Sequence, residues 1–200
     1  MADRTQTIFY GYAEEISKEL RALEIGSHLL IEYPDLQTLR EMYSHYTRFA
    51  LYDGNEIVVI LPFYETAEAV RRVLSGDGAW IDVRKCEKEQ ALLIIDSLQG
   101  YFGSKDGLMP FVKQTVEYAK SAGRSSVTVL GDMGSFFYYG RKDDLVGWEN
   151  KLPHRFEIDL KGFCLYHKRD YEARLFKGDK LKLSRHHSKI VHLLPHSFPS

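Results

Sequence analysis

Residues Gly54–Leu74, GNEIVVILPFYETAEAVRRVL, hold the pattern that decides the fold. Within this stretch, Glu56–Leu61 (EIVVIL) is a nearly continuous apolar run rich in β-branched residues, which predicts a strand buried on both faces. After a short turn, Glu65–Leu74 carries apolar residues at helical spacing, which predicts a short amphipathic helix. Strand, turn and helix in this order are typical of an α/β fold.

The same unit recurs on both sides of this stretch. Further strands are predicted at His28–Tyr33, Ala91–Ile95, Ser126–Leu130, Gly162–Tyr166 and Ile190–Leu194. Further helices are predicted at Asp35–Leu51, Pro110–Ser121, Leu145–Phe156 and Asp170–Phe176. Because the strands are apolar on both faces, we expect a mainly parallel, doubly wound sheet between two layers of helices.

The first part of the chain stands outside this repeat. Ala13–Leu23 (AEEISKELRAL) predicts an amphipathic helix that either caps the sheet or pairs with another subunit, and capping is favoured. We therefore predict an N-terminal helical extension over residues 1–24, one main domain over residues 25–194 and a tail over residues 195–200.

Composition excludes several classes of protein. The chain has 200 residues, of which 44% are hydrophobic and 28% charged, as is ordinary for a globular domain. The net charge of −1 gives no drive toward nucleic acid or acidic lipid, although the last quarter is basic. Apolar runs fall far short of the roughly 20 residues that span a bilayer. Both cysteines, Cys86 and Cys164, lie in or near apolar segments, which predicts reduced thiols and a cytoplasmic protein.

The predicted sheet nominates a binding site, because ligands of open α/β sheets bind beyond the carboxyl ends of the strands. The candidate ligand-binding residues near these ends and in the basic C-terminal segment are Tyr33, Tyr64, Glu65, Asp132, Tyr166, His186 and His187. Tyrosine and histidine would supply walls and hydrogen bonds, and Asp132 would orient a polar group. The aromatic run Phe136–Tyr139 either packs helices on the sheet or lines the same pocket.

Phosphate-binding motifs are absent from the sequence. The place where a P-loop would follow the first strand reads YPDLQTL (residues 33–39), with no glycine and no lysine, and Asp35 would repel a phosphate. The segment Ala91–Leu98 (ALLIIDSL) has the form of a strand ending in a magnesium-binding aspartate, but a helix cap is the commoner role for Asp96. These features argue against ordinary ATP hydrolysis.

Metal and nucleophile motifs are also absent. The eight histidines show no zinc-site spacing, and the adjacent His186 and His187 should point in different directions. His28 is expected to be a hydrogen-bonded structural residue, and Cys164 an inert thiol inside a strand. We predict no metal, no cofactor and no catalytic residue.

The order of motifs resembles the MEDS family, the sensory domain of methanogens, methylotrophs and the dichloromethane-dehalogenase regulator. The resemblance spans about residues 24–194. The motifs that carry it are Gly26-Ser27-His28 with Tyr33, Gly54–Leu74, Asp96 with Tyr101-Phe102, Val127–Met133 (VTVLGDM), Phe163–Tyr171 (FCLYHKRDY) and Arg185–Leu193 (RHHSKIVHL).

This resemblance implies a RecA- or KaiC-like fold that has lost its P-loop, and a non-catalytic role in signal transduction. It implies binding of a small organic ligand and relay through a signalling partner or a second copy of the chain. It also places Asp132 on the strand that carries the Walker B motif of the related ATPases, and Glu65 at the position of their catalytic glutamate.

Two alternatives remain open from the sequence. One is a degenerate nucleotide-binding protein, supported by Glu65, Asp132 and the basic C-terminal segment. The other is an oligomerising interaction module that uses the sheet edge or the N-terminal helix. The sequence identifies neither the ligand nor the partner.

Overall fold

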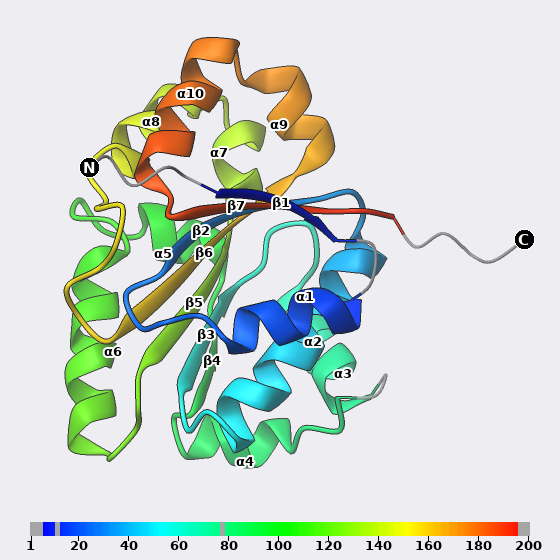
Figure 1. Cartoon of the computed structure of the whole chain (residues 1–200). Helices are drawn as coiled ribbons and strands as arrows, with labels where there is room; N and C mark the ends of the chain where they lie inside the picture. Colours follow the sequence, from blue (N-terminus) through cyan, green and yellow to red (C-terminus); the bar gives the residue numbers. More distant parts are fainter. Residues whose placement is uncertain (1–5, 11–12, 77–78, 196–200) are drawn as a thin grey trace, which may run out of the picture.

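Seven parallel strands form one sheet in the order β1-β7-β2-β6-β5-β3-β4 (Figure 1). The computed structural model describes residues 6–10, 13–76 and 79–195. The strands are β1 (Gln6–Tyr10), β2 (His28–Tyr33), β3 (Ile57–Leu61), β4 (Leu92–Ile94), β5 (Val127–Asp132), β6 (Leu160–His167) and β7 (Lys189–Leu193). The predicted α/β class and parallel sheet are confirmed.

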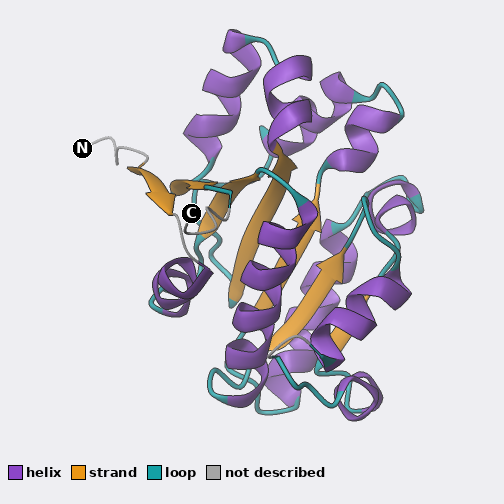
Figure 2. Ribbon diagram, turned by 90° about the vertical axis from the view of Figure 1, so that its right-hand side faces the viewer, coloured by secondary structure: helices purple, strands orange, loops and turns teal. Residues whose placement is uncertain are grey.

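Helices cover both faces of the sheet, which makes the predicted three layers (Figures 1 and 2). One core lies between the sheet and the helices α1 (Ala13–Arg21), α2 (Leu36–Tyr52), α3 (Ala67–Ser75) and α4 (Val83–Lys88). A second core lies beneath α5 (Ser97–Phe102), α6 (Met109–Ser121), α7 (Gly134–Tyr138), α8 (Lys142–Glu149), α9 (Lys168–Arg174) and α10 (Lys177–His186).

The strands divide their side chains between these two cores. In β2, Leu29 and Ile31 belong to the core under α1–α4, whereas Leu30 belongs to the core under α5–α10. This follows from the two-residue period of a strand, which points successive side chains to opposite faces. All six residues of β2 are buried, so polar residues of the central strands must find partners inside the protein.

The N-terminal segment differs from the prediction in one respect. Gln6–Tyr10 forms β1 and pairs with β7, so this segment adds a strand to the sheet as well as a helix. The predicted helix is present as α1, and Ile16 and Leu20 are buried in the core. This confirms that α1 caps the sheet. The segment QTIFY begins with two polar residues and lacks the continuous apolar run by which β3, also of five residues, was recognised.

Several short helices also escaped the sequence analysis. Helices α4, α5 and α7 have only five or six residues each, which is fewer than two helical turns. Such short segments show no recognisable helical periodicity. Helix α10 is longer, but Leu183 is its one buried residue among those described, so it shows no apolar stripe. The helix predicted at Leu145–Phe156 lies earlier, at Lys142–Glu149, and ends before Pro153 because proline is disfavoured inside a helix.

A buried ion pair joins β6 to the segment before β3. Lys161 Nζ lies 2.7 Å from Glu56 Oε1, and both side chains are almost fully buried. Tyr46 and Thr128 donate hydrogen bonds to the other carboxylate oxygen of Glu56. Both charges are thus satisfied inside the core under α1–α4.

We expect Lys161→Met to lower the free energy of unfolding by about 3 to 5 kcal/mol, because it leaves the Glu56 carboxylate buried without its counter-charge. Urea denaturation measures the change. The matched control is Lys120→Met, which removes an exposed pair with Asp159 (3.5 Å) and should cost less than about 1 kcal/mol. Equal losses in the free energy of unfolding for the two variants would show that the buried ion pair stabilises the fold no more than the exposed one.

Candidate functional site

The structure separates the predicted site residues into two groups. Tyr33 and Asp132 lie at the ends of β2 and β5 and face the helices α1–α4. Tyr166 lies near the end of β6 but belongs to the opposite core. His187 also lies on that side, where its ring contacts that of His28 in a tilted arrangement with centroids 4.1 Å apart. The alternation of side chains along the strands therefore splits what the sequence analysis placed in one site.

The first group forms a hydrogen-bonded network at the strand ends. Tyr33 donates to Asp132 Oδ2 at 2.7 Å, and the backbone N–H of Gly134 donates to Asp132 Oδ1 at 2.8 Å. Tyr64 donates to a carboxylate oxygen of Asp170 in α9. The cavity beside these groups measures only about 10 Å³, which is room for one water molecule at most.

Glu65 is held separately by α2. Its carboxylate accepts hydrogen bonds from Arg40 Nε and from the Tyr43 hydroxyl, each at 3.0 Å. The carboxylate is thus occupied by an ion pair and a hydroxyl. Ligand contact by Glu65, Tyr33, Tyr64 and Asp132 stays a prediction.

The second group belongs to a buried cluster of four side chains, His28, Glu149, Cys164 and His187, which we call the His–Glu–Cys cluster. Their potential ligand atoms all lie within 4.8 Å of one another. Glu149 Oε2 is 3.7 Å from His28 Nε2 and 3.5 Å from His187 Nε2, and Cys164 Sγ is 3.4 Å from His28 Nε2. All four residues are buried.

Backbone carbonyls fix the two imidazoles of the cluster. His28 Nδ1 lies 3.0 Å from the oxygen of Pro153 and 2.8 Å from that of His186, and His187 Nδ1 lies 2.7 Å from the oxygen of Leu183. Because a carbonyl only accepts, each Nδ1 carries the proton. Burial lowers the pKa of His28 to about 4 and that of His187 well below its usual 6.5, so both rings are neutral.

Glu149 connects the cluster to Tyr166. The Tyr166 hydroxyl donates to Glu149 Oε1 at 2.9 Å. Burial raises the pKa of Glu149 to about 7, and the hydrogen bonds from Tyr166 and Cys164 oppose that shift. Tyr166 therefore positions the carboxyl group of Glu149, and its contact with a ligand stays a prediction.

Sequence analysis identified part of this cluster. It nominated His187 and Tyr166, and its expectation that His28 is hydrogen-bonded is confirmed. His186 and His187 do point differently, since the half-buried His186 ring lies 3.3 Å from the oxygen of Leu152. Glu149 was missed because the four members come from β2, α8, β6 and the segment after α10, so no local spacing could reveal it.

Asp96 has the structural role that the sequence analysis favoured. It caps α5, and its Oδ1 accepts hydrogen bonds from the backbone N–H groups of Leu98 and Gln99 at 2.9 and 3.0 Å. The carboxylate is used by the helix terminus, as is typical of an N-cap residue.

An open cleft of about 860 Å³ lies between the segment that follows β4 and the helices α7 and α8 that follow β5. Its inner wall is aromatic. Tyr101 contacts Phe136 and Trp148 with ring centroids 5.0 and 5.7 Å apart, and Phe102 meets Phe136 edge-on at 4.9 Å. The cleft is thus lined by the segments that follow β4 and β5 in the chain.

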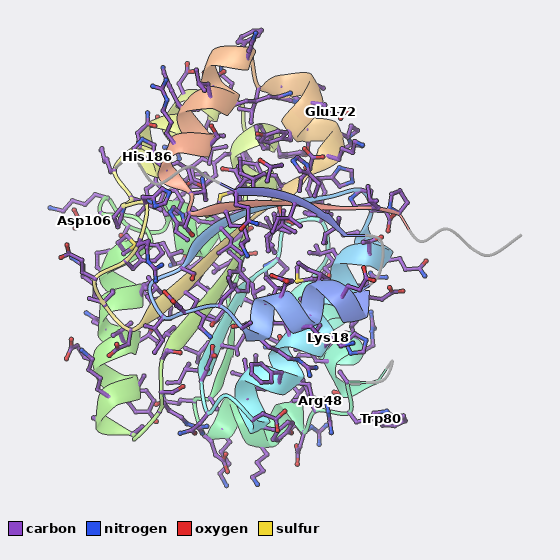
Figure 3. The ribbon with its side chains drawn as sticks, in the orientation of Figure 1. Lys18, Arg48, Trp80, Asp106, Glu172 and His186 are labelled. Atoms are coloured by element: carbon purple, nitrogen blue, oxygen red, sulfur yellow. The ribbon has the colours of Figure 1, made fainter. Side chains whose placement is uncertain are left out.

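The rim of this cleft is charged. Arg141 lies over the ring of Phe102 at 4.2 Å and pairs with Asp144 at 2.7 Å. Lys105, Asp106 and Lys151 also line it. Figure 3 shows Asp106 on the same side of the view as His186 and far from Trp80. The cleft therefore combines an apolar floor with both signs of charge at its edge.

A smaller apolar cavity of about 30 Å³ lies between the cleft and the His–Glu–Cys cluster. His28 and Cys164 line its inner side. Tyr101, Trp148 and Leu152 line both this cavity and the cleft. One layer of side chains therefore separates the open cleft from the buried cluster.

These features define a three-layer α/β domain with a solvent-open aromatic cleft beside its sheet and a buried polar cluster behind it. Comparison with protein-family models matches residues 27–183 to MEDS, the MEthanogen/methylotroph, DcmR Sensory domain. The match covers well over half of the chain, and the chain belongs to this family. It is therefore a sensory domain, which supports a role in signalling.

A search of curated proteins finds no match. Among the helices of the described residues, none is long and apolar enough to cross a membrane. The relation to RecA- and KaiC-like ATPases stays a prediction.

We expect Asp132 to make stability depend on pH. Burial raises its pKa from 3.8 to about 7, against the hydrogen bonds from Tyr33 and Gly134. Because the folded-state pKa exceeds that of the unfolded chain, stability is greatest below about pH 4 and falls as pH rises to about 7. The total loss is on the order of 4 kcal/mol.

Urea denaturation at several pH values, compared between wild type and Asp132→Asn, isolates this effect. The variant should show a smaller fall in stability between pH 4 and pH 7, although Glu149 contributes a fall of the same sign in both proteins. If the unfolding free energies of the two proteins depend on pH in the same way, the pKa of Asp132 is not raised in the folded protein.

Proposed function

We propose that this sensory domain binds a small organic molecule in the aromatic cleft between α5 and α8 and passes the bound state to another protein. The observation that carries the proposal is the cleft itself, about 860 Å³ in volume, with Tyr101, Phe102, Phe136 and Trp148 on its inner wall. Ligand sites of this size are typically concave, largely apolar and supplied with a few polar groups.

The lining suggests the chemical class of the ligand. Aromatic faces favour a flat or compact apolar body, because they bury large areas and stack in defined geometries. The rim carries the basic residues Lys105, Arg141 and Lys151 and the acidic residues Asp106, Asp143 and Asp144, so it favours a polar substituent without selecting the sign of its charge. An amphipathic organic molecule with one polar group fits both features.

The relay is proposed to pass through the helices that form the cleft. Trp148 and Glu149 are consecutive in α8, so a ligand that moves the indole also moves a residue fixed inside the protein. Helix α8 in turn contacts α7 and α10. The signalling partner, another protein or a second copy of this chain, would read the position of these helices.

Calorimetric titration tests the binding site, with benzoate, toluene and dichloromethane as probes. We expect saturable binding of at least one probe, and Trp148→Ala should weaken it by about tenfold or more, because a buried aromatic contact contributes roughly 1 to 2 kcal/mol. Phe102→Ala should act in the same direction.

The matched control is Trp80→Ala, because Trp80 is 73% exposed and lies away from the cleft (Figure 3). Its affinity for the probe should equal that of wild type. Equal affinities for the Trp148 variant and wild type would place the ligand elsewhere. Binding of Mg-ATP, with none of the organic probes bound, would instead favour the nucleotide-binding alternative.

A further inference from the structure

The His–Glu–Cys cluster draws its members from four distant parts of the chain. His28 begins β2, Glu149 ends α8, Cys164 lies within β6 and His187 follows α10. His28, Glu149 and His187 have no exposed side-chain surface, and Cys164 is 5% exposed. Burying four titratable side chains together is costly unless something in the site compensates for it.

The separations between the four groups match a metal site. Ligand atoms about 2.0 to 2.3 Å from a tetrahedral Zn²⁺ lie about 3.3 to 3.8 Å from one another. The three separations His28 Nε2–Cys164 Sγ, His187 Nε2–Glu149 Oε2 and His28 Nε2–Glu149 Oε2 are 3.4, 3.5 and 3.7 Å. All six lie within 4.8 Å, so small side-chain movements complete the tetrahedron.

The lone pairs also point inward. The carbonyl partners hold the proton of each imidazole on Nδ1, which turns Nε2 toward Glu149. Glu149 Oε2 is buried and accepts no hydrogen bond within the part of the chain that the structure describes. The Cys164 thiol is the proton donor among the four groups, since it hydrogen-bonds to Glu149. A cation that takes the place of this proton would meet four converging ligand atoms.

We propose that His28, Glu149, Cys164 and His187 bind one Zn²⁺ ion in a closed tetrahedral site. Two imidazole nitrogens, one thiolate and one carboxylate oxygen form a ligand set that suits Zn²⁺. One thiolate and one carboxylate cancel the charge of the divalent cation, so the loaded site is neutral inside the core. Binding releases to solvent the thiol proton of Cys164 and any proton that Glu149 carries.

The surroundings support such a site. Tyr166 holds Glu149 through its second oxygen, and backbone oxygens hold both imidazoles, as is usual for residues behind metal ligands. The apolar cavity lined by His28 and Cys164 lies one layer of side chains away from the open cleft. The inference is independent of whether an organic molecule binds in that cleft.

Spectroscopic titration of the full chain with Co²⁺ tests the proposal. Metal is first removed with a chelator, and Co²⁺ is then added under reducing conditions. We expect one equivalent to produce a thiolate-to-cobalt charge-transfer band and the strong visible absorption of tetrahedral cobalt. One equivalent of Zn²⁺ should displace the cobalt and abolish both signals.

Variants assign the ligands. Cys164→Ser should abolish the charge-transfer band, whereas Cys86→Ser, which removes the other buried thiol, should leave it unchanged. His187→Asn should abolish tetrahedral binding, whereas the neighbouring His186→Asn should retain it. Tyr166→Phe keeps all four ligands and should weaken Co²⁺ affinity by about 10- to 100-fold.

Each outcome bears on the proposal. Wild-type protein that shows no cobalt absorption and no zinc-dependent rise in melting temperature would overturn it, leaving the cluster as a hydrogen-bonded network. A band lost in Cys86→Ser and retained in Cys164→Ser would also overturn it. Circular dichroism verifies that each variant folds. If Cys164→Ser does not fold, the titration of the wild-type protein decides the question.

Discussion

The structure depends on one constraint: its central strands are buried on both faces. Successive residues of each strand enter different cores, so every polar side chain on β2, β5 and β6 is committed to one of two dry interiors. Lys161 meets Glu56 on one side, and Cys164 meets His28 on the other. Because buried polar groups are stabilised by partners inside the protein, the doubly buried sheet brings together both the ion pair and the His–Glu–Cys cluster.

Helix α8 joins the features that bear on function. Its residue Trp148 closes the aromatic cleft, and the next residue, Glu149, lies in the buried cluster. Consecutive residues of a helix point in directions about 100° apart, so one short segment faces both the cleft and the interior. The cleft and the cluster thus share one structural element, through which the proposed ligand would act on the interior.

Most of the fold could be predicted from residues with a strong pattern. The apolar β-branched run before Pro62 and the helical spacing from Leu36 to Tyr52 gave elements close to their observed bounds. Pattern fails where a strand lacks a continuous apolar run, as in β1, or where a helix is shorter than two turns, as in α7. It also misplaced α8, because the apolar residues beyond Glu149 continue a helical spacing that Pro153 interrupts.

The sequence by itself determined the class of the fold, the sensory family and the positions of Tyr33 and Asp132 at strand ends. These features follow from local periodicity and short motifs. Only the tertiary structure decided that Tyr33 and Tyr166 face opposite cores, and that Glu149 joins His28, Cys164 and His187. The reason is physical: a side chain's direction depends on register, and contacts between residues more than a hundred positions apart depend on the order of strands in the sheet.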